Sequence, residues 1–336
     1  MPRAKAWASK ARVNAVLHYR LSNDLAGSLG RRTPDWLRLV TVDSSDSVAL
    51  AKIFRTMDVL FHVLDPVTDY LMSFAPQLKL IQKIGVGVDT IDLVAANKRE
   101  IIVANMPGTN TRAVAEMTLS LILCVLRRVV MLDRSVRVGS GWNLAPESYE
   151  GVGEVFGRVV GFIGYGAVPR YLAPILQSLG ARIIYSSRTL LPGPVGEARS
   201  LNDLLAEADI VSLHVPSTPA TEALINQESI ARMRRGSILI NTARGSLIDE
   251  AALTDALNSG HIRGAGIDVL RSEPARSDNP LLSLDNVVVT PHTAWLTPET
   301  FHRSLTVAIE NCRRLRDGEP LLHQINFTQY SAVSDR

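Results

Sequence analysis

The stretch "VVGFIGYGAVPR" (159–170) decides the fold. Its apolar start predicts a buried strand, Gly164 and Gly166 predict a tight turn, and a helix is expected to follow. This strand–turn–helix order is typical of a dinucleotide-binding sheet, whose helix N–H groups meet phosphates. A glycine turn that binds no ligand would give the same short pattern, so the rest of the chain has to choose between the two interpretations.

The third glycine of this turn pattern is replaced by Pro169. That position usually serves helix–sheet packing, and a proline in the first turn of a helix removes no intrahelical hydrogen bond. The N–H groups of Ala167 and Val168 are still available to a phosphate. Pro174 lies deeper, and we expect it to kink or delay the helix.

Two series of short apolar runs alternate with helical segments, which predicts βαβ units and parallel sheets. We expect long helices over 111–131 and 297–317. The predicted strands of the first series cover 13–19, 37–42, 58–63, 78–85 and 101–105, and those of the second cover 158–164, 181–186, 209–215, 237–243, 264–269 and 286–290.

The predicted fold class is therefore α/β, with two doubly wound parallel-sheet domains. A Rossmann-type cofactor domain (111–295) is inserted into a flavodoxin-like substrate domain (1–110 plus 296–336). We expect a small-molecule site in the cleft between two such domains.

The segment after the second strand of the nucleotide domain, "YSSRTL" (185–190), indicates which nucleotide is bound. An NAD site usually carries an acid here, yet no Asp or Glu occurs between Glu154 and Glu197. Ser187, Arg188 and Thr189 could instead bind a 2′-phosphate. The sequence favours NADP (NADPH) over NAD, although Arg188 could also be an ordinary solvated arginine.

Three further motifs follow predicted strands: "NTARGSLIDE" (241–250), "GAGIDVLRSEP" (264–274) and "VVVTPHTAW" (287–295). Together with "IGVGVDTID" (84–92) and "AVAEMTLSLIL" (113–123), they make the chain from about residue 55 onward resemble the D-isomer-specific 2-hydroxyacid dehydrogenases, including glyoxylate and hydroxypyruvate reductases. The chain ends soon after "HQINF" (323–327), so we expect it to lack the regulatory domain of longer phosphoglycerate dehydrogenases.

The resemblance implies that Arg244, Glu273 and His292 are catalytic. A guanidinium can bridge the carboxylate and the carbonyl of a 2-oxo acid. Reduction of that carbonyl leaves an oxygen that needs a proton, which His292 would give, and Glu273 would bind the other ring nitrogen. Each motif alone could be structural: a surface arginine, a loop, or a packed histidine.

The resemblance also implies the remaining contacts. The substrate would meet Arg244 and the backbone of Val86 and Gly87, with Trp295 shaping the pocket, although Trp295 could simply pack the start of a helix. His62 could lie at the strand ends of the first domain. The implied cofactor-binding residues are Gly164, Gly166, Ala167, Val168, Ser187, Arg188, Thr189, Val215, Pro216, Thr221, Thr242 and Asp268.

The composition argues against several kinds of binding partner. The net charge is only +3 and the basic residues are spread out, which argues against nucleic acid, and no apolar run is long enough to predict a membrane span. Cys124 and Cys312 lack metal-ligand spacing, so we expect reduced thiols, no metal and a cytoplasmic location. Relatives dimerise through the helix at 111–131, which implies a homodimer.

Two functions remain open at this point. The first is an NADP(H)-dependent reductase of a small 2-oxo acid, similar to glyoxylate or hydroxypyruvate. The second is a nucleotide-sensing interaction protein on the same scaffold, since some relatives act as transcriptional co-repressors.

Overall fold

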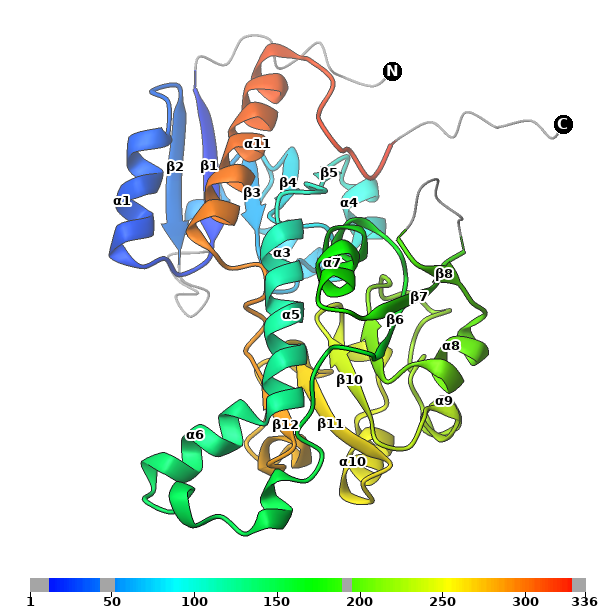
Figure 1. The fold of residues 1–336 in the computed structure, drawn as a ribbon. Coiled ribbons are helices and arrows are strands. Elements are labelled where there is room, and N and C mark those ends of the chain that lie inside the picture. Colours follow the sequence, from blue (N-terminus) through cyan, green and yellow to red (C-terminus); the bar gives the residue numbers. More distant parts are fainter. Residues whose placement is uncertain (1–11, 43–51, 189–194, 328–336) are drawn as a thin grey trace, which may run out of the picture. The chain divides into compact units, whose positions relative to one another are not determined.

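The computed structural model describes residues 12–42, 52–188 and 195–327. The chain forms two compact units (Figure 1): unit 1 comprises residues 1–110 and 297–336, and unit 2 comprises residues 111–296. Each unit is built on one parallel sheet, so the predicted α/β class with two parallel-sheet domains is confirmed. Among the described residues, no helix combines the length and the apolar character needed to cross a bilayer.

Unit 1 has a five-stranded sheet in the order β2-β1-β3-β4-β5, which is the flavodoxin-like order. Its strands are nearly continuous in apolar character because helices cover both faces. The strands are β1 (Val13–His18), β2 (Leu37–Val42), β3 (Val59–His62), β4 (Leu80–Lys83) and β5 (Ile102–Ala104), and the helices are α1 (Asn23–Arg32), α3 (Asp69–Ser73), α4 (Leu93–Lys98) and α11 (Pro298–Asp317).

The end of the chain returns to unit 1, where α11 lies with the N-terminal strands (Figure 1). Asn311 of α11 is fully buried, and its amide donates to Gln82 Oε1 of β4 at 2.6 Å and to the Leu322 carbonyl at 3.1 Å. Asn326 accepts from the Val103 N–H of β5 at 2.7 Å. These buried hydrogen bonds attach the last described segment to the sheet, because a buried amide without partners would be costly.

Unit 2 has a seven-stranded sheet in the order β12-β11-β10-β9-β6-β7-β8, and the strand order reverses at β6, as in Rossmann folds. The strands are β6 (Val159–Ile163), β7 (Arg182–Ser186), β8 (Glu197–Ala198), β9 (Ile210–Leu213), β10 (Ser237–Asn241), β11 (Ile262–Ile267) and β12 (Val287–Val289). The helices are α5 (Thr111–Arg127), α6 (Val129–Arg137), α7 (Ala167–Ser178), α8 (Leu201–Glu207), α9 (Gln227–Arg232) and α10 (Glu250–Asn258), with short 3₁₀ turns at Gly141–Asn143, Pro146–Tyr149, Gly245–Leu247 and Pro280–Ser283.

Three local predictions differ from the structure. The single helix predicted over 111–131 is wrong: α5 ends at Arg127, Arg128 has a left-handed φ of 51°, and α6 starts at the β-branched Val129. The two-residue strand β8 has no apolar run to reveal it. Strand β11 ends at Ile267, so Asp268 lies just beyond the strand instead of inside it.

Candidate active site

The turn between β6 and α7 leaves backbone donors exposed at a helix start. Most helices begin at a side chain that accepts a backbone N–H, namely those capped by Ser22, Thr68, Asp92, Ser200, Asn226, Asp249 and Thr297. Helix α7 begins instead at Gly166, which offers no side-chain cap. The N–H groups of Ala167 and Val168 have no acceptor among the described residues. A helix start of this kind suits an anion.

Gly166 also leaves room for that anion. A Cβ built on Gly166 would have no atom within 4 Å, so the space before the first turn of α7 is open. Pro169 is buried in this turn, and α7 continues through Pro174 to Ser178. The donors and the open space fit the pyrophosphate of a dinucleotide, with Gly164 and Gly166 forming the tight turn.

Arg188 follows β7, beside this turn. The Gly164 N–H donates to the carbonyl of Ser186, the last residue of β7, at 2.8 Å. Ser187 is half-buried and Arg188 is exposed, whereas Thr189 lies outside the described residues. The structure thus places a guanidinium after the second strand of the sheet, where an NAD site usually has an acid.

The loop after β9 carries Val215, Pro216 and Thr221. The Thr221 hydroxyl donates to the Pro216 carbonyl at 2.7 Å and accepts from the Thr218 N–H at 2.9 Å. Thr221 therefore closes this loop on itself, which sets the positions of Val215 and Pro216.

Thr242 follows β10. The Thr118 hydroxyl of α5 donates to Val114, so in its 2.9 Å contact with Thr242 the Thr242 hydroxyl is the donor. This bond ties the end of β10 to α5.

The central pair of the site joins His292 and Glu273. Nδ1 of His292 lies 2.6 Å from Glu273 Oε2, and the Leu270 N–H donates to Glu273 Oε1 at 2.9 Å. The carboxylate accepts a hydrogen bond from the Nδ1–H group, which fixes the orientation of the ring and leaves Nε2 as the nitrogen that is free to face a substrate. The His292 backbone has a left-handed φ of 54°, an uncommon conformation for a residue other than glycine.

The pKa of Glu273 reflects this pairing. Burial acts to raise the pKa of Glu273, but the hydrogen bond from His292 and its charge outweigh that effect. The Leu270 N–H and the charge of Arg244 act in the same lowering direction, so the pKa of Glu273 falls below its usual value. Glu273 is therefore ionised at neutral pH and able to accept from His292.

Asp268 holds the loop that carries His292. Its side chain is 2% exposed, and its carboxylate accepts from the Thr290 hydroxyl (2.5 Å) and from the N–H groups of Thr293 (2.9 Å) and Ala294 (3.0 Å). Its carbonyl accepts the His292 N–H at 2.8 Å. The sequence suggested only a nicotinamide contact for Asp268. This positioning role was missed, although a buried Asp in the apolar "GAGIDV" signals a residue that needs hydrogen-bond donors.

Neighbouring residues fix the position of Arg244. The buried Asn241 amide donates to the Arg244 carbonyl at 2.7 Å. A Cβ on Gly245 would lie 2.0 Å from the Leu270 carbonyl carbon, so only glycine permits this close approach of the two loops. Arg244 therefore lies next to the segment 270–273, which carries Glu273, and Nη1 of Arg244 donates to the Ala243 carbonyl at 2.7 Å.

The other predicted substrate contacts lie partly elsewhere. Trp295 is 8% exposed and follows the His292 loop. Val86 and Gly87 belong to unit 1, after β4, where the Asn105 amide donates to the Val86 carbonyl at 2.9 Å. The N–H groups of Val86 and Gly87 have no acceptor among the described residues.

The predicted residues of unit 2 that the structure describes gather at one edge of its sheet. They follow β6, β7, β9, β10, β11 and β12, that is, the carboxyl ends of parallel strands, where ligands of such sheets bind. No group of three or more His, Cys, Asp or Glu side chains among the described residues is arranged to hold a metal ion.

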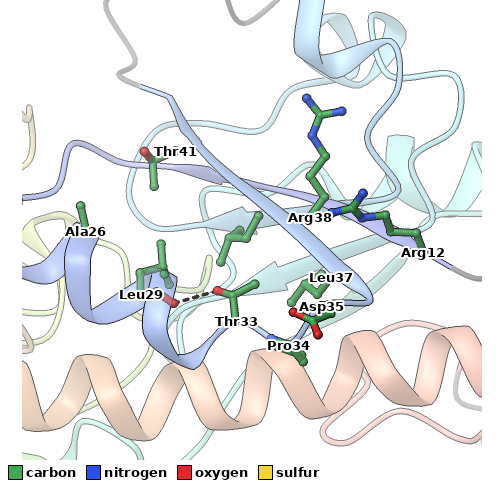
Figure 2. Close-up of a pocket in the computed structure, with 11 residues that line it drawn as sticks. Arg12, Ala26, Leu29, Thr33, Pro34, Asp35, Leu37, Arg38 and Thr41 are labelled. Atoms are coloured by element: carbon green, nitrogen blue, oxygen red, sulfur yellow. Dashed lines mark hydrogen bonds between the residues drawn. The ribbon is translucent and has the colours of Figure 1, made fainter.

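A hollow of about 480 Å³ in unit 1 is not part of this arrangement. It lies between α1 and β2 (Figure 2), with the exposed Arg12 and Arg38 on one side and Thr33 and Leu29 on the other. It contains none of the predicted site residues and lies along the edge strand β2, not at the strand ends.

Comparison with known proteins identifies the family. A sequence model described as "D-isomer specific 2-hydroxyacid dehydrogenase, NAD binding domain" matches residues 119–294. The chain belongs to the D-isomer specific 2-hydroxyacid dehydrogenase family. The predicted resemblance is thereby confirmed.

Two relatives and one solved structure are informative. The chain is 40% identical to a glyoxylate reductase of Aeropyrum pernix over 79% of this chain and 82% of that protein. It is 36% identical to a D-3-phosphoglycerate dehydrogenase of Mycobacterium leprae over 91% of this chain, but it spans only 58% of that protein's length. The structure is similar to an NADPH-dependent glyoxylate/hydroxypyruvate reductase of Sinorhizobium meliloti in complex with NADP and malonate, with a TM-score of 0.79, 27% identity, and coverage of 94% of this chain and 97% of that one.

Proposed function

We propose that the protein is an NADPH-dependent reductase of a small 2-oxo acid, similar to glyoxylate or hydroxypyruvate. The observation that carries this proposal is the His292–Glu273 hydrogen bond of 2.6 Å, next to Arg244 at the carboxyl edge of a nucleotide-binding sheet. A proton donor and a carboxylate-binding cation at the nucleotide edge are what carbonyl reduction requires.

The residues divide the chemistry as follows. Arg244 binds the substrate carboxylate and polarises its carbonyl, with the N–H groups of Val86 and Gly87 as further donors and Trp295 as a wall of the pocket. His292 gives a proton from Nε2 to the carbonyl oxygen, while Glu273 holds Nδ1 and stabilises the ring. Bound NADPH supplies the hydride. Thr242 and Asp268 face the nicotinamide end, and Asp268 also keeps the His292 loop in place.

In this proposal the nucleotide domain (111–295) binds the phosphates of NADPH at Gly164, Gly166, Ala167 and Val168. Three further residues line the nucleotide-binding site: Val215, Pro216 and Thr221. The substrate domain comprises residues 1–110 and 296–336. The preference for NADP is supported by the absence of acids between Glu154 and Glu197 and by Arg188, with Ser187 and Thr189 as additional donors. The similar Sinorhizobium meliloti reductase is NADPH-dependent, which also supports a preference for NADP.

Arg188→Ala tests the cofactor preference. We expect the dissociation constant for NADPH to rise roughly 10- to 100-fold, because a charge-assisted hydrogen bond to the 2′-phosphate is lost. Affinity for NADH should stay unchanged. Fluorescence titration with both nucleotides measures the two constants, and Arg232→Ala on α9 is a control for loss of a positive charge. Equal weakening of both nucleotides would show that Arg188 does not read the 2′-phosphate.

The substrate is tested by following NADPH oxidation with a panel of 2-oxo acids. We expect the highest kcat/KM with glyoxylate or hydroxypyruvate. A phosphorylated 2-oxo acid belongs in the panel because of the similar phosphoglycerate dehydrogenases. No turnover on any of them, together with intact nucleotide binding, would contradict the reductase and favour a nucleotide-sensing interaction protein.

We also propose a homodimer located in the cytoplasm. Leu123 of α5 and Val129, Val130 and Val136 of α6 are exposed apolar side chains, which a second copy would cover. Cys124 and Cys312 are unpaired thiols, which suits a reducing compartment. Sedimentation velocity should give about twice the chain mass, and a monomer at micromolar concentration would contradict the dimer.

A further inference from the structure

The loop that carries Glu273 is exposed. We call residues 271–279 the Glu273 loop: residues 271–278 are all exposed, and the loop lies between the buried Leu270 and Leu281. A segment that buries no apolar side chain of its own is held in place mainly by its hydrogen bonds. The position of Glu273 therefore depends on the residues that form hydrogen bonds with this loop.

Glu250, the first residue of α10, binds both ends of the Glu273 loop. Its Oε1 atom accepts the Arg271 N–H at 2.6 Å, and its Oε2 atom accepts the side-chain amide of Asn279 at 2.9 Å. Oδ1 of Asn279 accepts the Leu281 N–H at 3.0 Å, so the N–H₂ group of Asn279 is the part directed at Glu250. Both carboxylate oxygens of Glu250 are thus engaged by a loop more than 20 residues further along the chain.

Glu250 is not needed as the cap of its own helix. The N-cap of α10 is Asp249, whose Oδ1 atom accepts the N–H groups of Ala251 at 3.1 Å and Ala252 at 3.2 Å. The carboxylate of Glu250 is therefore available to the Glu273 loop, because Asp249 already satisfies these backbone donors.

The hydrogen bond to Glu250 lies beside the one that orients Glu273. The Leu270 N–H donates to Glu273 Oε1 at 2.9 Å, and the next N–H along the chain, that of Arg271, donates to Glu250. Consecutive Cα atoms are only about 3.8 Å apart, so a displacement of Arg271 also displaces Leu270. That displacement would reach Glu273 and, through its hydrogen bond, His292.

Glu250 also belongs to the segment that carries Arg244. The start of this segment packs against the backbone of residues 270–271 at Gly245, and its end binds the Glu273 loop through Glu250. The charge of Arg244 helps to lower the pKa of Glu273, so these two side chains lie near each other. The two attachments fix Arg244 and Glu273 relative to one another.

We propose that Glu250 is a positioning residue of the active site. By holding both ends of the Glu273 loop, it keeps Glu273 within hydrogen-bond reach of His292. Glu250 itself contacts neither the substrate nor the nucleotide in this proposal. The inference rests on the proposed roles of His292 and Glu273.

Glu250→Gln keeps the size of the side chain but leaves one acceptor for two donors. We expect kcat for NADPH oxidation with the best 2-oxo acid to fall roughly 5- to 50-fold, because a small displacement of a catalytic group is costly in rate. The dissociation constant for NADPH, measured by fluorescence titration, should stay unchanged, which also shows that the variant is folded. Glu250→Ala removes both acceptors and should lose more turnover.

The pH profile of turnover separates positioning from stability. A carboxylate partner favours the protonated imidazole ring, and the charged side chains that act on Glu273 are His292 and Arg244. When Glu273 is displaced, proton donation requires a lower pH, so the alkaline limb of the kcat/KM profile should move down by roughly 0.5–1 pH unit. A loss of folded enzyme would lower the whole profile without moving that limb.

Asn279→Ser tests the same contact from the loop, with Glu250 in place. A serine can accept the Leu281 N–H as an N-cap, but the amide that donates to Glu250 is gone. We expect the alkaline limb to move in the same direction as in Glu250→Gln, and by less.

Glu222→Gln is the matched control. Glu222 pairs with the exposed side chain of Arg271 at 2.6 Å, so this variant removes the same charge beside the same residue but leaves its backbone N–H bound. An exposed ion pair contributes little. Both kcat and the alkaline limb should therefore stay as in the parent.

Parent-like turnover with an unmoved alkaline limb in Glu250→Gln would overturn the inference. An equal loss in Glu222→Gln would also overturn it, because the effect would then come from charge and not from the backbone contact. If instead the proposed roles of His292 and Glu273 were wrong, His292→Asn would keep near-normal turnover, so the two failures are distinguishable.

Discussion

The carboxyl edges of the two sheets carry histidines in opposite electrostatic settings. In unit 1, His62 ends β3, next to His18 at the end of β1 and Lys83 at the end of β4. His62 is fully buried, and its Nε2 donates to the carbonyl of Asp65 at 2.7 Å. In unit 2, His292 follows β12 and donates to the carboxylate of Glu273.

The two histidines differ because their rings donate to different hydrogen-bond acceptors. Burial, together with the charge of Lys83, lowers the pKa of His62 to about 3, and the Asp65 carbonyl only partly opposes this. His62 is therefore a neutral ring at physiological pH. Glu273, by contrast, gives His292 a negatively charged acceptor. The same residue type at the same topological place becomes a fixed neutral group in one sheet and a candidate proton donor in the other.

The largest effect should come from removing the proton donor. His292→Asn keeps a residue that tolerates a left-handed backbone but removes the acid, so we expect kcat to fall roughly 10²- to 10⁴-fold. Affinity for NADPH should be nearly unchanged, as fluorescence titration would show. Stopped-flow or steady-state NADPH oxidation measures the loss, and His292→Ala should behave similarly.

His323→Asn is the matched control for this change, because His323 also has a left-handed φ, of 53°, and lies in unit 1. It should retain full turnover. Near-normal activity of His292→Asn would mean that the proton comes from another group, and the contrast between the two edges would then lose its functional meaning.

The next effect concerns the support of the His292 loop. Asp268→Asn leaves one oxygen for three donors and points an amide N–H₂ at a backbone N–H, so we expect the free energy of unfolding to fall by about 1–3 kcal/mol. Turnover should also fall, since the loop that carries His292 loses hydrogen bonds that hold it in place. Urea unfolding and NADPH oxidation measure the two losses.

Asp249→Asn makes the same chemical change at the half-buried N-cap of α10, where Asn caps as well as Asp. This control should cost only a few tenths of a kcal/mol. If Asp268→Asn were equally mild, the Asp268 hydrogen bonds would not be what holds the loop.

The smallest expected effect concerns His62 in unit 1 and the pH dependence of stability. The pKa of His62 is depressed in the folded protein, so the unfolded chain binds a proton that the folded one does not between pH 6.5 and about 3. Stability from this group is complete above pH 6.5 and is lost as the pH falls. Below pH 6 the parent should lose about 1.4 kcal/mol more per pH unit than His62→Gln.

Urea midpoints at pH 7.0, 6.0 and 5.0 for the parent and His62→Gln test this difference. Parallel pH profiles would indicate that His62 takes up a proton without unfolding, and the two edges would then not differ as described.

Part of this organisation was predictable from local patterns. The two series of apolar runs predicted both parallel sheets, because strands covered on both faces need continuous apolar sequence. The helix break at Arg128 and the short strand β8 were not predictable, since neither depends on an apolar period. Among site residues, His292, Glu273 and Arg244 stood out by residue type and order. The clamp by Asp268 did not, because its three donors lie in a loop more than 20 residues along the chain.

By itself, the sequence determined the fold class, the family and the chemical groups available for a reaction. Apolar periodicity and short motifs are local properties, so they can be recognised in a single sequence. Only the tertiary structure decided which histidine meets a carboxylate and which carboxylate positions a loop. Those outcomes depend on burial and on distances between residues far apart in the chain, and no local pattern contains either.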